Sequence, residues 1–132
     1  MTDSIIRIGV IGCAKIAKRS VLPAILDLPN HFKLIAVASR DELKANEFAE
    51  AFGCEPIKGY EAIIARDDID ALYIPLPTGL HFEWVGRAIE AGKHVYVEKS
   101  FSLSSNQTSP LIEVASRKDV AVMEGYMFLY HR

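Results

Sequence analysis

The 132-residue chain has 15 Lys and Arg against 17 Asp and Glu, a net charge of −2, and 50% of its residues are hydrophobic. This composition is typical of one globular domain, and the scattered cations offer no binding surface for nucleic acid or for an anionic membrane. No apolar run reaches the roughly 18 to 20 residues of a membrane-spanning helix, and the N-terminus does not resemble a signal peptide. We therefore expect a cytoplasmic protein without nucleic-acid or membrane partners.

Two kinds of apolar segment alternate along the chain. Short β-branched runs predict strands at residues 5–11, 33–38, 71–75, 94–98 and 120–126. Apolar residues at three- and four-residue spacing predict helices at residues 16–28, 42–52, 60–65, 81–91 and 106–118. This β-α-β-α order predicts an α/β fold of the Rossmann type, a doubly wound parallel sheet with helices on both faces.

Residues that start and stop helices agree with this order. Gly53 and Gly92 stand where helices should end, and Asp41 and either Ser104 or Ser105 are suited to N-cap positions. Proline removes a backbone donor and clashes one turn back, so Pro23 should split or kink the first helix near residues 20–22. The two cysteines have no metal-binding spacing, so we expect reduced, partly buried thiols and no metal site.

The loop after the first strand has the pattern of a dinucleotide-binding fingerprint, Gly12-Cys13-Ala14-Lys15-Ile16-Ala17. Glycine permits a tight turn, and free N–H groups at the start of the next helix favour a pyrophosphate. Alanine replaces the usual second glycine, which is acceptable where the backbone has negative φ. The alternative is a tight strand-to-helix turn with nothing bound; the context favours a cofactor loop formed by residues 12–16.

The second predicted strand ends in Ser39-Arg40. An Asp or Glu near this position binds the adenosine ribose of NAD, whereas a hydroxyl and a guanidinium can bind the 2′-phosphate of NADP. The sequence therefore predicts NADP as the preferred cofactor, with NAD as the alternative. Asp41 follows at once, and an N-cap role is a better prediction for it than a ribose contact.

Two further segments lie beyond strand ends, at the edge where open α/β sheets bind ligands. After the third expected strand come Leu76, Pro77 and Thr78, with Thr78 able to cap the next helix and His81 in its first turn. For His81 a cap or cofactor contact is a better prediction than catalysis, and Phe82 and Trp84 are predicted to pack. Glu98 and Lys99 end the following strand.

In combined order and spacing, these motifs resemble the N-terminal domain of the glucose-fructose oxidoreductase and inositol dehydrogenase family, often written Gfo/Idh/MocA. The resemblance rests on the loop at residues 12–17, the Pro-x-x-x-His turn at 77–81 and the segment AGKHVYVEKS at 91–100, and it spans nearly the whole chain. Two positions depart from the family pattern. Ser100 replaces the usual proline after Glu-Lys, and Ala14 is common in dihydrodiol dehydrogenases and nucleotide-sugar ketoreductases, which the closing MEGYMFLYHR also resembles.

The resemblance implies particular roles for particular residues. Lys99 matches the catalytic lysine and Glu98 lies near the nicotinamide. Cofactor contacts fall on four positions after the preceding strand: Leu76, Pro77, Thr78 and His81. It also implies a Rossmann domain at residues 1–125, with residues 126–132 starting a connection to a C-terminal substrate domain through which the protein forms a homo-oligomer.

The expected function is hydride transfer between NADP, or NAD, and a sugar, polyol or related hydroxy or keto substrate, with residues 1–132 inactive on their own. Two alternatives stay open: a dihydrodiol-type dehydrogenase and a non-catalytic NAD(P)-sensing module. Lys99 argues against the second. The substrate, the reaction direction and the oligomeric state do not follow from the sequence.

Overall fold

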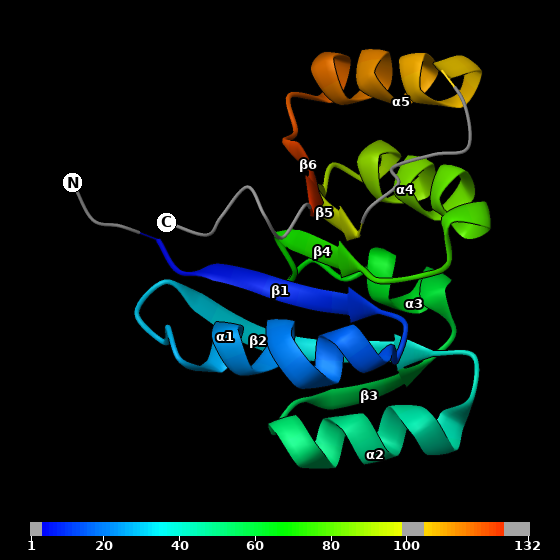
Figure 1. Cartoon of the computed structure of the whole chain (residues 1–132). Helices are drawn as coiled ribbons and strands as arrows, with labels where there is room; N and C mark the ends of the chain where they lie inside the picture. The colour runs from blue at the N-terminus through cyan, green and yellow to red at the C-terminus, as the bar shows by residue number, and fades with distance from the viewer. Residues whose placement is uncertain (1–3, 99–104, 126–132) are drawn as a thin grey trace.

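In the computed structural model, residues 4–98 and 105–125 are described (Figure 1). In this part of the chain a six-stranded sheet has the order β3-β2-β1-β4-β5-β6, and all of its pairings are parallel. The order reverses between β1 and β4, which gives the sheet two halves. The strands are β1 (Ile6–Ile11), β2 (Phe32–Ser39), β3 (Glu55–Lys58), β4 (Ala71–Ile74), β5 (His94–Glu98) and β6 (Val122–Gly125).

Helices cover both faces, as the sequence predicts. The helices are α1 (Leu22–Leu26), α2 (Glu42–Phe52), α3 (Tyr60–Ile64), α4 (His81–Glu90) and α5 (Ser105–Lys118). Two buried apolar clusters lie on opposite faces of the sheet, one containing residues of α1 and α2 and the other residues of α3, α4 and α5. The last four residues of β1 are buried because helices pack on both of its sides.

The first helix differs from a single continuous helix over residues 16–28. A π-helical turn at Ala17–Val21 precedes α1, and Pro23 occupies the first turn of α1. Proline lacks the N–H that an α-helix interior requires, so the change of helix type just before it confirms the predicted split. The bounds of α2 match the prediction, because Asp41 caps its start and Gly53, at φ +70°, ends it.

The strand β3 was missing from the sequence prediction. Its four residues, Glu-Pro-Ile-Lys, carry two charges and a proline and show no strand pattern. β3 lies at the edge of the sheet and, among the strands that the structure describes, pairs only with β2. An edge strand tolerates proline since one side of it needs no ladder donor. Two smaller expectations were also wrong: Phe82 is 40% exposed rather than packed, and no side-chain cap bond from Thr78 is present at the 3₁₀ turn Thr78–Leu80.

One half of the sheet has a face, called the open face below, that no helix of the described residues covers. On the α1 side of β4, β5 and β6, no described helix covers the strands, and an apolar hollow of about 650 Å³ lies there. Its lining includes Ile16, Ile25, Tyr73, Tyr96 and Glu98.

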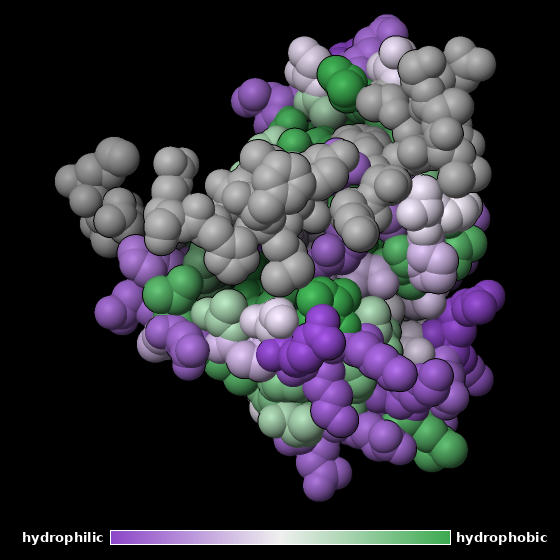
Figure 2. All heavy atoms as spheres, viewed as in Figure 1, coloured by the Kyte–Doolittle hydropathy of each residue, from purple (hydrophilic) through white to green (hydrophobic). Residues whose placement is uncertain are grey.

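On the face shown in Figure 2, hydrophilic side chains alternate with apolar patches. No helix of the described residues is long and apolar enough to cross a membrane.

Candidate functional site

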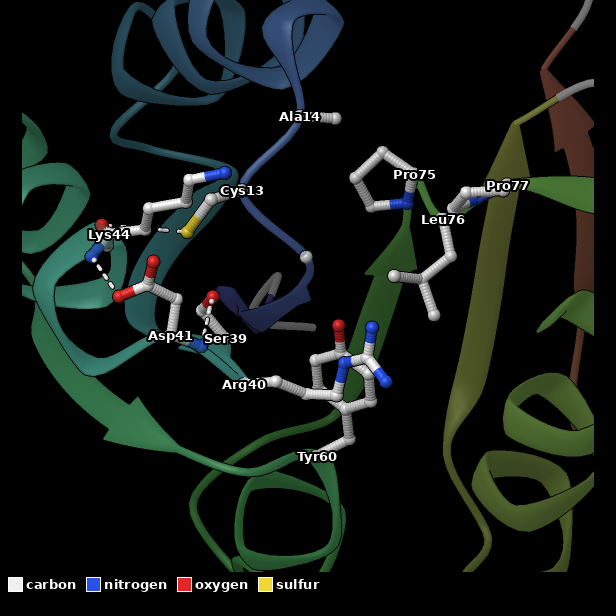
Figure 3. Close-up of a pocket in the computed structure, with 11 residues that line it drawn as sticks. Cys13, Ala14, Ser39, Arg40, Asp41, Lys44, Tyr60, Pro75, Leu76 and Pro77 are labelled. Carbon is white, nitrogen blue, oxygen red and sulfur yellow. Dashed lines mark hydrogen bonds between the residues drawn. The ribbon is translucent and has the colours of Figure 1, made fainter.

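A pocket of about 260 Å³ opens at the carboxyl edge of the sheet, beside the point where the strand order reverses. It combines the loop after β1, the end of β2, the start of α2, the first residue of α3 and the loop after β4 (Figure 3). Its lining residues are Gly12, Cys13, Ala14, Ser39, Arg40, Asp41, Lys44, Tyr60, Pro75, Leu76 and Pro77. Seven of these were predicted from the sequence as cofactor-binding residues.

Gly12 makes the turn that opens the pocket. Its φ is +111°, and a Cβ atom there would lie 2.8 Å from Cδ2 of Leu76. The Gly12 N–H donates to the carbonyl of Ala38 at 2.9 Å, which ties the loop to the end of β2. Among the described residues other than glycine, only Asp119 has positive φ, so Ala14 adds its methyl group without backbone strain. Only glycine fits at the first position of the fingerprint, and alanine suits the second.

The end of β2 forms the polar wall of the pocket. The Oγ atom of Ser39 accepts a hydrogen bond from the Asp41 N–H at 3.0 Å, so the hydroxyl hydrogen is left to donate, either to the Cys13 sulfur or to a ligand. One carboxylate oxygen of Asp41 accepts from the N–H groups of Leu43 and Lys44, at 3.0 and 3.4 Å. These bonds confirm that Asp41 is the N-cap of α2, and they turn its carboxylate toward the helix.

Four residues of the pocket were not predicted as cofactor contacts: Asp41, which was predicted as an N-cap, and Lys44, Tyr60 and Pro75, which the sequence analysis missed. Lys44 stands in the first turn of α2, and its carbonyl accepts a weak bond from Sγ of Cys13 at 3.6 Å. Tyr60 is 7% exposed and packs edge-on against Trp84, with ring centroids 4.9 Å apart. Lys44 follows Arg40 by four residues, and this spacing of two cations after a strand end could have indicated a second phosphate contact. No feature of the sequence near Tyr60 indicates that it lies in the pocket.

The pocket carries a positive charge. Burial raises the pKa of the Cys13 thiol, while a hydrogen bond with Ser39 opposes that shift, so the thiol is neutral near pH 7. Burial also raises the pKa of Tyr60, and the neighbouring Arg40 partly offsets the effect through its charge and a hydrogen bond. Arg40 and Lys44 therefore contribute two cations against the single carboxylate of the N-cap. A phosphate group matches this set of donors.

His81 lies behind the pocket rather than in it. The ring is completely buried, and its Nε2 atom is within hydrogen-bond distance of the carbonyl of Leu76. The bond joins the first residue of α4 to the turn after β4, so it holds Leu76 and the following Pro77 at the pocket wall. Trp84, one turn further along α4, is 9% exposed, which confirms its predicted packing role.

The remaining predicted residues lie outside this pocket. Lys15 is exposed, Thr78 is partly buried in the 3₁₀ turn, and Ile16 and Glu98 line the apolar hollow on the open face. The predicted catalytic residue Lys99 and the N-cap candidate Ser104 are outside the described residues, as is the domain connection at 126–132. In the described part of the chain, no group of three or more His, Cys, Asp or Glu could hold a metal ion.

The comparisons with known proteins give the family. A family model described as "Oxidoreductase family, NAD-binding Rossmann fold" matches residues 6–126. This chain belongs to that family, Gfo/Idh/MocA. A dTDP-3,4-didehydro-2,6-dideoxy-alpha-D-glucose 3-reductase of Saccharopolyspora spinosa is 48% identical over 126 residues, which are 96% of this chain and 38% of that protein. A D-xylose 1-dehydrogenase (NADP(+)) of Haloferax volcanii is 39% identical over 93% of this chain and 38% of its own length.

Solved structures agree with the family assignment. A 3-ketoreductase from Actinomadura kijaniata, in complex with NADP and TDP-benzene, matches with a TM-score of 0.94 and 48% identity over 97% of this chain and 39% of that one. A biliverdin reductase from Synechocystis, in complex with biliverdin and NADP+, matches with a TM-score of 0.86 at 25% identity. The chain spans 38% of the length of the S. spinosa relative.

Proposed function

We propose that the chain is the cofactor-binding domain of an NADP-dependent oxidoreductase that acts on a keto or hydroxyl group of a sugar. The observation that carries the proposal is the wall of the pocket formed by Ser39, Arg40 and Lys44. An NAD-binding domain usually has a free carboxylate here for the ribose, whereas this wall offers a hydroxyl donor and two cations. That set binds the 2′-phosphate that distinguishes NADP from NAD.

The other pocket residues fit the rest of the dinucleotide. The missing side chain of Gly12 leaves room beside Leu76 for a pyrophosphate to approach the backbone. The helical run that starts at Lys15 presents N–H groups without intrahelical partners, which attract phosphate oxygens. The Arg40 guanidinium, which Figure 3 shows beside Tyr60, is suited to stacking on an adenine ring. When bound, the cofactor supplies or accepts a hydride at C4 of its nicotinamide.

Lys99 is the residue that we propose as acid and base, on the strength of the family resemblance. Its ammonium group would polarise a carbonyl and donate a proton during reduction, and its amine form would accept one during oxidation. The relatives that reduce dTDP-linked keto sugars make a keto sugar carried on a nucleotide the leading substrate class. We further propose that a second domain, as in these longer relatives, supplies the remaining substrate contacts and the oligomer interface.

The test compares NADP and NAD binding in three single variants. Arg40→Ala should weaken NADP by about 10- to 100-fold, the scale of a hydrogen bond to a charged group, and NAD by only a few-fold. Lys44→Ala should act in the same direction with a smaller effect, since a lysine makes one flexible contact. Binding can be followed by the fluorescence of Trp84, the single tryptophan, which packs on Tyr60 at the pocket.

Lys33→Ala is the matched control. Lys33 is an exposed cation on the same strand, β2, but six residues from Ser39 and therefore at the opposite edge of the sheet. At about 3.3 Å per residue that separation is about two Debye lengths at physiological salt, so its charge is screened from the pocket. Equal losses of NADP affinity in the control and in Arg40→Ala would refute the assignment of the 2′-phosphate site.

A further inference from the structure

A buried tyrosine bonds to a carboxylate across two neighbouring strands. Tyr73, on β4, is 2% exposed, and its hydroxyl donates a hydrogen bond to Oε2 of Glu98, the last residue of β5. The register pairs Tyr73 with Tyr96, and their rings stack with centroids 5.3 Å apart and an interplanar angle of 23°. The stack directs the phenol toward the carboxyl end of β5, where it holds the Glu98 side chain.

The NADP pocket described above does not include this pair. Both residues line the hollow on the open face, on the β4–β6 side of the point where the strand order reverses. A dinucleotide crosses the carboxyl edge of such a sheet at the reversal. Because the adenosine end falls at β2, beside Ser39 and Arg40, the nicotinamide end must extend over the half that contains β4 and β5. The carboxylate of Glu98 stands on that half.

We infer that Tyr73 is a positioning residue: it fixes the charged carboxylate of Glu98 at the nicotinamide end of the site, so that the protein binds the oxidised cofactor more tightly than the reduced one. This inference rests on the proposed function. The oxidised nicotinamide ring is a cation and the reduced ring is neutral, so a fixed carboxylate attracts only the first by direct charge interaction. Hydride transfer to a carbonyl carbon moves two electrons and one hydrogen off the ring and leaves it cationic. The same carboxylate therefore stabilises the charge that develops during reduction.

In this pair the phenol of Tyr73 keeps its proton. Burial and the neighbouring carboxylate both raise the pKa of Tyr73 far above its usual value, so the proton stays on the phenol. The phenol is therefore the donor of the bond and the Glu98 carboxylate is its acceptor. Since the phenol is buried and its ring is stacked, the carboxylate has one preferred position rather than several.

The experiment measures dissociation constants for NADP+ and NADPH by calorimetry, with the full-length protein. Tyr73→Phe keeps the ring and its stacking and removes only the hydroxyl. The ratio of the NADP+ constant to the NADPH constant should rise by about fivefold to tenfold, less than the loss of a full hydrogen bond to a charged group, because Glu98 keeps its charge and loses only the bond that fixes its position. Glu98→Gln keeps an acceptor for the phenol but removes the charge, and it should raise the ratio at least as much.

The double variant tests whether Tyr73 acts through Glu98. If it does, Tyr73→Phe adds nothing to the ratio once Glu98→Gln is present. Tyr60→Phe serves as the control, since it removes the hydroxyl of another buried tyrosine, at the adenosine end. It should leave the ratio of oxidised to reduced cofactor unchanged.

Three outcomes would overturn the inference. Tyr73→Phe could change the NADP+ and NADPH constants by the same factor, or its effect on their ratio could add in full to the effect of Glu98→Gln. The third is that Tyr60→Phe changes the ratio as much as Tyr73→Phe does. Should Tyr73→Phe fail to fold, Glu98→Gln with an unchanged ratio would overturn it alone. A wild-type protein that binds neither NADP+ nor NADPH would refute the proposed function instead.

Discussion

Replacing Gly12 by alanine tests the backbone on which the site depends. At φ +111° Gly12 lies outside the left-handed region that other residues occasionally adopt, and strain of this kind costs about 1 to 3 kcal/mol. The new Cβ would also stand 2.8 Å from Cδ2 of Leu76, and moving that buried side chain adds about 1 kcal/mol. We expect a total loss of about 3 kcal/mol in the free energy of unfolding.

Two other glycines provide the controls. Gly53 has φ +70° and open space around it, so Gly53→Ala should cost only about 1 kcal/mol. Gly79 does not have positive φ, and a Cβ atom added there would have no neighbour within 4 Å. Gly79→Ala should therefore leave the free energy of unfolding nearly unchanged. Urea unfolding followed by circular dichroism gives the three values. If Gly12→Ala is as stable as Gly79→Ala, the strained turn is absent. The cofactor loop would then have no structural need for glycine at position 12.

Three further predictions concern other parts of the chain. In the full-length protein, Lys99→Ala should lower turnover by about 100-fold while NADP affinity changes only a few-fold, and near-normal turnover would make Lys99 a surface charge. The Arg7 guanidinium lowers the pKa of Asp70 to about 2, so this carboxylate stabilises the fold above about pH 4 and the gain is lost as the pH falls toward 2. Asp70→Asn should therefore lose less stability between pH 6 and pH 3 than the wild type, and equal losses would contradict the ion pair. The buried ammonium of Lys93 donates to two backbone carbonyls, and Lys93→Met should cost about 2 kcal/mol in a urea titration, whereas no loss would mean that water replaces the bonds.

Local chemistry was enough to predict much of the fold. The bounds of α2 follow from an N-cap at Asp41 and a left-handed glycine at position 53, both interactions within one turn of the helix. The turn at Gly12 and the split of the first helix before Pro23 also depend on single residues and their chain neighbours. Sequence patterns record such short-range preferences directly, so these features were determined by the sequence by itself.

Tertiary structure alone decided which distant residues meet. β3 exists because β2 offers an edge for pairing, although its own four residues show no strand pattern. Tyr60 reaches the pocket because Trp84 supports its ring from another helix. The bond between Tyr73 and Glu98 joins residues 25 positions apart, through a register set by the whole parallel sheet. Contacts of this kind depend on how the strands and helices pack together, which no local preference specifies.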